Sequence, residues 1–257
     1  MNNLLHNNNL PLIIAHRGES HDAPENTLSA INLAWKRGSD GCEIDVQLTK
    51  DDQIVVIHNK RTKMTWGNSL RIKSHTLQKL KSLNVVSNIN GKWFTERIPT
   101  LSEVILTVPP DKYLFIEIKC DIEIIPHLKK VLSSSLLNPS QVKIIGFGLK
   151  RMTVIKKNFQ EFEVFLNRRV NAGKVFSGKF YWDKLIKKIK LGSLDGINVS
   201  YTKSINIILI EKFKLNNLKI FVWTINKPRR ALRLISIGIN GLMSDRSGWI
   251  KEKVMMQ

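Results

Sequence analysis

The chain has 257 residues, 42% of them hydrophobic and 24% charged, which is enough for one α/β barrel with a large core. Lys and Arg number 41 against 21 Asp and Glu, and the resulting net charge of +20 attracts anionic molecules over a long range. No apolar run reaches the roughly 18 residues of a transmembrane helix, and the first residues lack a secretory signal pattern, so we expect a soluble cytoplasmic protein.

Basic residues are densest between residues 143 and 190. Aromatic residues do not alternate with them there, as they would on a surface that stacks nucleic acid bases. We therefore expect solvated helix faces and no nucleic acid partner. The basic surface would permit weak association with an anionic membrane, and the sequence leaves the oligomeric state open.

Short apolar runs alternate with segments of helical period from residue 12 onward, which is typical of repeated β-α units around a parallel sheet. We therefore predict a (β/α)8 TIM barrel in a single domain that spans residues 1–257. The candidate strands are residues 12–15, 41–46, 113–118, 142–146, 163–166, 195–199, 219–224 and 239–243.

A further apolar run, residues 54–57, follows the second strand after only residues 49–53. Parallel neighbours need a longer crossover, so this run is predicted to return antiparallel as a hairpin and to bring His58 to the level of Glu43 and Asp45. The irregular residues 59–99 are predicted to be an insertion between the second and third barrel strands.

Two helix starts are recognisable in the sequence. Asn26 or Thr27 is suited to cap a helix that begins at residue 28. Thr100 and Glu103 have the spacing of a capping box, in which each side chain accepts a hydrogen bond from the other residue's backbone.

Acidic residues occur inside two predicted strands. Glu43 and Asp45 are two apart and therefore share a face, and Glu117 and Lys119 repeat this spacing on the neighbouring strand. Buried acids are costly unless they are neutralised, and oxygen ligands without clustered Cys or His favour Mg²⁺, Ca²⁺ or Mn²⁺ over zinc. Structural ion pairs with Lys119 and Arg17 are the alternative interpretation.

Two histidines follow apolar runs at expected strand ends. Either His16 or His58 alone is typical of a satisfied core or rim histidine, but a pair beside a cation is suited to proton transfer near neutral pH. Arg17 offers planar donors that fit a phosphate, and Lys119 offers a point charge. The set predicts a site for an anionic substrate.

At these residues the sequence resembles a known family. Residues 14–18, Ile-Ala-His-Arg-Gly, and residues 23–27, Ala-Pro-Glu-Asn-Thr, resemble the opening signature of glycerophosphodiester phosphodiesterases at the usual spacing. The resemblance extends over nearly the whole chain and is loose between residues 125 and 215. It continues through residues 43–49, 54–58, 98–104, 115–119 and 221–224.

The resemblance implies metal-dependent hydrolysis of a small-molecule glycerophosphodiester to sn-glycerol 3-phosphate and an alcohol such as choline or ethanolamine. It implies that Glu43, Asp45 and Glu117 bind a divalent cation and that His16 and His58 are the catalytic acid and base. Attack by water and attack by the neighbouring glycerol hydroxyl, through a cyclic phosphate, are both compatible with it.

The resemblance also implies that Arg17 and Lys119 bind the phosphate and that Trp223 is a wall for the glycerol moiety, with plain barrel packing as the alternative for Trp223. Two departures concern the site. Asn59 stands where the family usually has aspartate after the second histidine, and residues 244–247, Ser-Asp-Arg-Ser, replace the usual Thr-Asp-(Arg or Lys)-Pro.

Two rival functions follow from the same sequence. One is a lysophospholipase D-like or other phospholipase that the basic surface brings to a membrane, although no amphipathic anchor supports it. The other is an inactive barrel that binds anions by charge alone. Three inward acids would weaken that attraction, which disfavours the inactive barrel.

Overall fold

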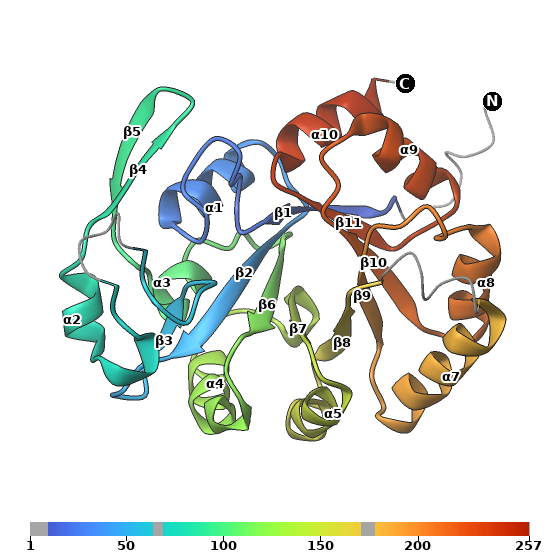
Figure 1. Ribbon diagram of the computed structural model, residues 1–257, viewed down its shortest axis with the longest axis horizontal. Helices are drawn as coiled ribbons and strands as arrows, with labels where there is room; N and C mark the ends of the chain where they lie inside the picture. The colour runs from blue at the N-terminus through green and yellow to red at the C-terminus, as the bar shows by residue number, and fades with distance from the viewer. Residues whose placement is uncertain (1–9, 64–68, 171–177, 257) are drawn as a thin grey trace.

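Eight parallel strands close into a barrel in the computed structural model, which describes residues 10–63, 69–170 and 178–256 (Figure 1). The first strand pairs in parallel with both the second and the last, and this double pairing closes the ring. The predicted (β/α)8 barrel is confirmed. Its strands are β1 (Leu12–His16), β2 (Gly41–Leu48), β6 (Tyr113–Ile118), β7 (Val142–Gly146), β8 (Glu163–Arg168), β9 (Gly196–Ser200), β10 (Lys219–Trp223) and β11 (Gly241–Ser244).

The barrel strands form where the sequence has short apolar runs. Every residue of β2 is buried, and its outward positions are the apolar Cys42, Ile44, Val46 and Leu48, which pack against the helices. The bounds of the strands differ from the predicted bounds by no more than two residues at either end. The positions of the short apolar runs therefore predicted the barrel strands.

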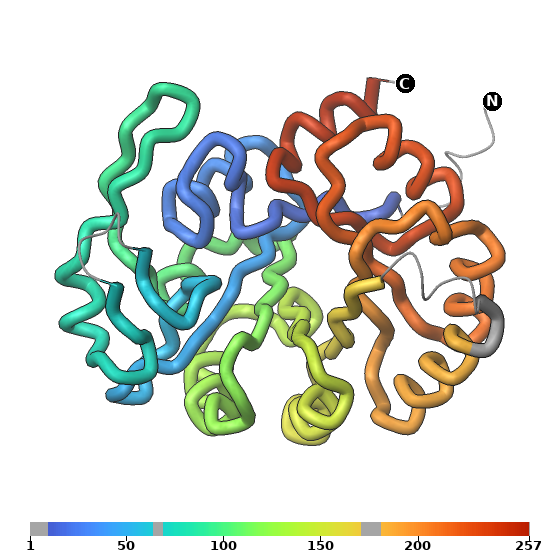
Figure 2. The backbone as a smooth tube through the Cα atoms, in the orientation of Figure 1, coloured from blue at the N-terminus to red at the C-terminus, as the bar shows by residue number. Residues whose placement is uncertain are grey.

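Helices surround the barrel on its outside (Figure 2). They pack against the outward side chains of the strands in one large apolar core. Thr27 caps the first helix by accepting a hydrogen bond from the Ala30 amide, and the predicted capping box of Thr100 and Glu103 is present. The helices of this layer are α1 (Leu28–Lys36), α3 (Leu101–Ile105), α4 (Ile125–Ser133), α5 (Leu149–Asn158), α7 (Gly178–Leu191), α8 (Ile207–Leu215), α9 (Pro228–Ser236) and α10 (Ser247–Met255), with 3-10 turns η3 (Ile122–Ile124) and η4 (Pro139–Gln141).

The strand β3 (Ile54–Val56) returns antiparallel along β2, as the short connection predicts. Beyond its end, the Ile57 amide donates to the Asp45 carbonyl at 2.8 Å. This bond holds the following residue, His58, beside the middle of β2.

Residues 69–99 lie beside α1 and β3 and contain a two-stranded hairpin that projects from the barrel (Figure 1). A small apolar cluster that includes Ile57, Ile72, Leu80 and Ile98 anchors this region to β3. Its elements are η2 (Ile72–Ser74), α2 (Leu77–Lys81), β4 (Val85–Ile89) and β5 (Lys92–Glu96). Among the described residues, no helix has the length and apolar character needed to cross a membrane.

Inward side chains form layers inside the barrel. At the amino ends of the strands, Glu163 forms ion pairs with Lys143 and Lys219. The inward positions beyond the middle layer, toward the carboxyl ends, carry polar side chains, and the candidate site is built there. The middle layer is apolar and consists of Ile14, Phe115, Ile145, Phe165, Phe221 and Met243.

Candidate active site

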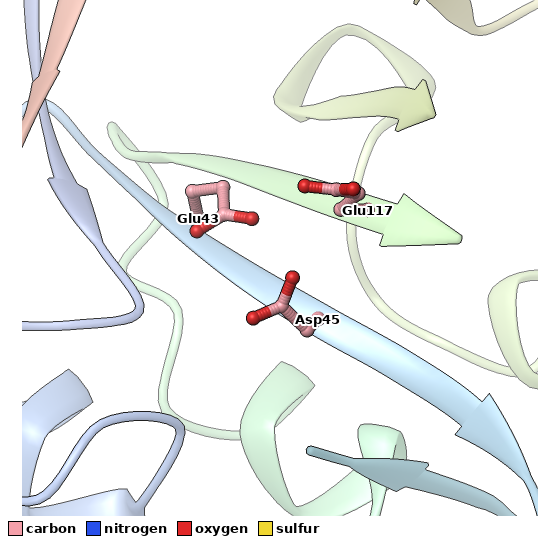
Figure 3. A group of neighbouring side chains, drawn as sticks. All are labelled: Glu43, Asp45 and Glu117. Carbon is pink, nitrogen blue, oxygen red and sulfur yellow. The ribbon is translucent and has the colours of Figure 1, made fainter. Parts of the chain in front are cut away.

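Three carboxylates meet above the apolar layer. Glu43 and Asp45 project from β2 and Glu117 from β6, and one oxygen of each lies within 4.8 Å of the others (Figure 3). All three are buried, and Asp45 pairs in register with Glu117. The spacing of two residues along each strand therefore brings the predicted acids together as expected from the sequence.

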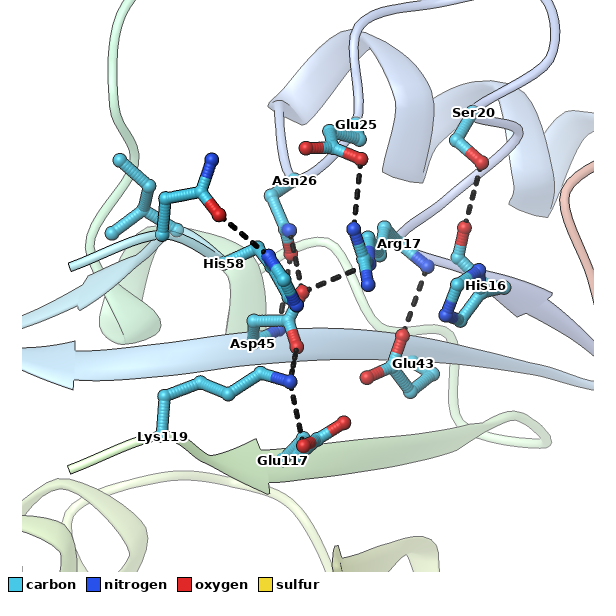
Figure 4. A network of polar contacts seen from close by, with 12 residues as sticks. His16, Arg17, Ser20, Glu25, Asn26, Glu43, Asp45, His58, Glu117 and Lys119 are labelled. Carbon is cyan, nitrogen blue, oxygen red and sulfur yellow. Dashed lines mark hydrogen bonds and ion pairs between the residues drawn. The ribbon is translucent and has the colours of Figure 1, made fainter. Parts of the chain in front are cut away.

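Two basic side chains neutralise part of this cluster (Figure 4). Lys119 Nζ lies 2.9 Å from Asp45 Oδ1 and 2.6 Å from Glu117 Oε1, and Arg17 Nε lies 3.1 Å from Asp45 Oδ2. Asn26 Nδ2 also donates to Asp45 Oδ2, at 2.9 Å. Burial raises the pKa of Asp45, but Lys119 and Arg17 outweigh it, so that the pKa is lowered overall.

Glu43 forms no ion pair with a Lys or Arg side chain among the described residues. Its Oε2 accepts a hydrogen bond from the Arg17 amide at 3.0 Å, while Oε1 is buried without a hydrogen-bond partner. Burial and the charge of Asp45 raise the pKa of Glu43 to about 8. An unsatisfied buried oxygen beside two more carboxylates is where a hard cation fits, and all three donors are oxygens. The described residues therefore match the predicted divalent cation.

The loop after β1 aims Arg17 at the acids. Arg17 has a φ of 60°, a left-handed conformation that is uncommon for non-glycine residues, and its amide points at Glu43. Gly18 follows with a φ of 80°, and a Cβ there would lie 2.6 Å from the Ala30 carbonyl carbon in α1. Only glycine lets the loop approach α1 this closely, so the Arg17-Gly18 pair has a structural reason.

His16 ends β1 and lies beside Glu43 (Figure 4). Its Nδ1 is 2.7 Å from Asp245 Oδ1, and Asp245 also accepts hydrogen bonds from Ser20 Oγ at 3.3 Å and Asn226 Nδ2 at 2.6 Å. Burial lowers the pKa of His16, but the hydrogen bond to Asp245 and the charge of Glu43 raise it, and the net shift is upward. The partner of this histidine is thus a carboxylate.

His58 lies beside Asp45 (Figure 4). Its Nδ1 is 2.9 Å from Asn59 Oδ1, so the residue that departs from the family pattern still contacts the ring, without a charge. Gln47 Nε2 donates to the carbonyls of Ile57, His58 and Asn59 at 3.2, 3.1 and 2.6 Å. Gln47 holds the backbone that carries His58.

Sequence reasoning assigned no role to Asp245 or Gln47. Gln47 was detectable, because it is the next inward position of β2 after Asp45. Asp245 was detectable from barrel closure, because β11 lies next to β1 and its carboxyl end lies beside His16. Both residues position a histidine, and neither lies within the acid cluster.

Trp223 ends β10 and is half-buried at the carboxyl ends of the strands. Its Nε1 donates to the Asn198 carbonyl at 3.1 Å, and its ring meets Phe147 edge to face with centroids 6.3 Å apart. The predicted site residues on β1, β2 and β6 and His58 come together, while Trp223 stands on the wall formed by β7 to β10.

Comparison with known proteins agrees with this geometry. The model of the glycerophosphoryl diester phosphodiesterase family matches residues 16–249. A glycerophosphodiester phosphodiesterase of Caldanaerobacter subterraneus is 31% identical over 91% of this chain and 93% of its own length. A putative glycerophosphodiester phosphodiesterase of Bacillus subtilis is also 31% identical, over 93% of this chain and 96% of its own.

Solved structures are similar as well. A phosphodiesterase of Oleispira antarctica, in complex with the product sn-glycerol-3-phosphate, is 25% identical with a TM-score of 0.78 and coverage of 96% and 97%. A putative glycerophosphoryl diester phosphodiesterase of Silicibacter pomeroyi shares the fold, with a TM-score of 0.84 at 17% identity and coverage of 98% and 96%. The chain therefore belongs to the glycerophosphodiester phosphodiesterase family of phosphoric diester hydrolases.

Proposed function

We propose that the protein hydrolyses glycerophosphodiesters to sn-glycerol 3-phosphate and an alcohol, with a divalent cation held by Glu43, Asp45 and Glu117. The observation that carries the proposal is the meeting of these buried carboxylates beside His16 and His58. The product bound in the similar Oleispira antarctica structure supports the substrate class.

The donor set supports Mg²⁺, Ca²⁺ or Mn²⁺, because carboxylate oxygens are the ligands that these hard ions prefer. When bound, such an ion supplies Lewis-acid polarisation of a phosphoryl oxygen. Arg17 and Lys119 lie beside the carboxylates and present guanidinium and ammonium donors to the phosphate. They stabilise the negative charge that develops on the phosphoryl oxygens in the transition state.

The two histidines divide the proton transfers. The Asp245 carboxylate stabilises the imidazolium form of His16, whereas the Asn59 Oδ1 accepts the Nδ1–H of His58 and so leaves Nε2 of that ring as the proton acceptor. His58 Nε2 therefore takes a proton from the attacking water as its oxygen bonds to phosphorus. His16 Nε2 donates a proton to the alcohol oxygen as the bond from phosphorus to that oxygen breaks.

The remaining contacts of the substrate are with the opposite wall. Trp223 offers a half-buried ring beside Phe147, and the glycerol moiety lies against it. In the variant route, a glycerol hydroxyl attacks phosphorus first, the alcohol leaves with a proton, and water then opens the cyclic phosphate. Transient cyclic phosphate in a ³¹P NMR time course distinguishes this route from direct attack by water.

Purified protein, stripped with a chelator, is tested for hydrolysis of glycerophosphocholine, glycerophosphoglycerol and a lysophospholipid. We expect hydrolysis of the water-soluble diesters to stop after stripping and to return with Mg²⁺, Ca²⁺ or Mn²⁺. Hydrolysis that continues unchanged after treatment with the chelator would refute the proposed divalent cation. A preference for the lysophospholipid would replace the proposal by the lipid-cleaving alternative.

Replacement of either histidine tests the proton transfers. His16→Ala and His58→Ala should each lower kcat by about 100- to 10,000-fold, the usual contribution of general acid-base catalysis. His75→Ala is the matched control, because His75 is outside the site and its ring contacts the Arg71 carbonyl through Nδ1. A near-normal rate for one site variant would remove that histidine from the mechanism.

A further inference from the structure

An arginine stands at the barrel mouth on the wall opposite the acid cluster. In β8, Phe165 packs edge to face on Phe221 inside the barrel, and Asn167 accepts a hydrogen bond from Asn198 at 3.0 Å. Because inward positions recur every second residue, Arg169 is next in this inward series, just past the end of the strand. Its side chain therefore belongs to the mouth of the barrel and not to the outer helical layer.

The Arg169 guanidinium lies between two aromatic side chains. Its Cζ is 5.9 Å from the ring centroid of Phe147 and 5.9 Å from that of Trp223. These rings come from β10 and from the loop after β7, so three segments of the same wall converge on one point. Cation-π contact with two rings holds the guanidinium over the same Trp223 that faces the substrate.

The charge of Arg169 is not neutralised by the part of the chain that the structure describes. No described carboxylate lies within ion-pair distance of its guanidinium, which is exposed. Arg17 and Lys119, in contrast, each form ion pairs with carboxylates of the site. The planar donors of Arg169 are therefore available to an anion at the mouth.

The same arrangement disfavours a cationic group. A trimethylammonium group would bind to aromatic faces, but here a guanidinium already lies over both rings and repels it. A phosphate or carboxylate at the same place would instead accept hydrogen bonds from the guanidinium.

We propose that Arg169 binds a second anionic group of the substrate, a phosphate or carboxylate carried by the alcohol moiety, which extends past the glycerol at Trp223 toward the guanidinium. The preferred substrates are then glycerophosphodiesters with a further negative charge beyond the diester, and not those of choline. This inference rests on the proposed function and adds the substrate class to it.

The chain offers a matched control one residue away. Arg168 has the same charge but points outward, where its Nε donates to Tyr181 Oη in α7 at 2.8 Å. Arg168→Gln and Arg169→Gln therefore remove the same net charge from adjacent positions on opposite faces of β8. A long-range effect of charge would appear in both variants, and a local contact only in the second.

The experiment measures kcat/KM of the wild type and both variants, in the same divalent ion and at fixed ionic strength. The substrates are glycerophosphocholine, glycerophosphoglycerol, and glycerophosphoglycerol with a phosphate on its terminal glycerol. We expect the wild type to prefer the phosphorylated diester over the choline diester. Arg169→Gln should reduce the ratio of these two kcat/KM values by about 10-fold, as for the loss of a charge-assisted contact, and Arg168→Gln should preserve it.

The outcomes separate the two proposals. If all three diesters are hydrolysed and the ratio is the same in the wild type and in Arg169→Gln, the inference about Arg169 fails while the proposed function stands. Equal loss of the ratio in both variants also overturns it, in favour of long-range charge. If the wild type hydrolyses none of the diesters with any divalent ion, both proposals fail.

Discussion

Replacement of Asp245 by asparagine tests the proposed protonation of His16. The Asp245 carboxylate accepts hydrogen bonds from His16, Ser20 and Asn226, with two oxygens available. In the Asp245→Asn variant, one oxygen remains and the other position becomes an NH₂ group. If the oxygen keeps its bond to Asn226, the NH₂ group faces His16 Nδ1 and excludes the tautomer that the carboxylate selects.

The size of the effect follows from the lost bond. A hydrogen bond to a charged group contributes about 1.5 to 3 kcal/mol, so kcat should fall by about 10- to 150-fold. The direction of the pH effect follows from the raised pKa of His16. Protonated His16 persists above its ordinary pKa of 6.5 because of Asp245, so the variant should lose the acid form at lower pH. The alkaline limb of the kcat/KM profile should therefore move to lower pH.

The assay is a pH profile of diester hydrolysis for the wild type, Asp245→Asn and Asp22→Asn. Asp22 is the matched control, because it pairs with His21 Nδ1 at 2.6 Å outside the acid cluster. We expect the Asp22→Asn profile to coincide with that of the wild type. An alkaline limb that stays in place in Asp245→Asn would refute the assignment of His16 as the acid.

The remaining predictions concern the charges at the two ends of the barrel. Glu163→Gln should lower the free energy of unfolding by about 1 to 2 kcal/mol at pH 7, because Lys143 and Lys219 lose their shared partner. Burial raises the pKa of Glu163, but the two lysines lower it overall. The loss of unfolding free energy in the variant should therefore shrink as the pH falls below the pKa that Glu163 has in the unfolded chain. The exposed Glu252→Gln should change stability by less than about 0.5 kcal/mol, and an equal effect of both would contradict the reasoning. Lys119→Met should abolish most hydrolysis. The rise in Tm on adding a divalent ion should be larger than in the wild type, because the Lys119 ammonium no longer competes with the ion for the carboxylates. An unchanged rise in Tm would exclude that competition.

Much of the acid cluster was predictable from the sequence because it depends on alternation along strands. The spacing of Glu43 and Asp45 determines that both face inward, whatever the exact strand bounds. The short connection to residue 54 likewise required an antiparallel return, which located His58. These properties are local in the sequence, so one chain without structural information was enough.

Contacts beyond the strand ends were less predictable. The partner of His16 is 229 positions away in the sequence, and only the closure of the barrel brings Asp245 beside it. Arg169 follows the end of β8, where the direction of a side chain depends on the loop conformation as well as on strand alternation. Its neighbours Phe147 and Trp223 come from the loop after β7 and from β10, and no local pattern relates the three.

The barrel mouth thus has two walls of different character, and with the proposed roles of these walls chemistry and selectivity can change independently. Strands β1, β2 and β6 carry the carboxylates and His16, which are buried and linked by hydrogen bonds and ion pairs, so a substitution there disturbs several partners. On the other wall, the Arg169 guanidinium lies over two rings and forms no ion pair with a described carboxylate. A substitution of Arg169 leaves the charges around the proposed cation unchanged. The identity of the substrate can therefore shift through this wall at little cost to the proton transfers.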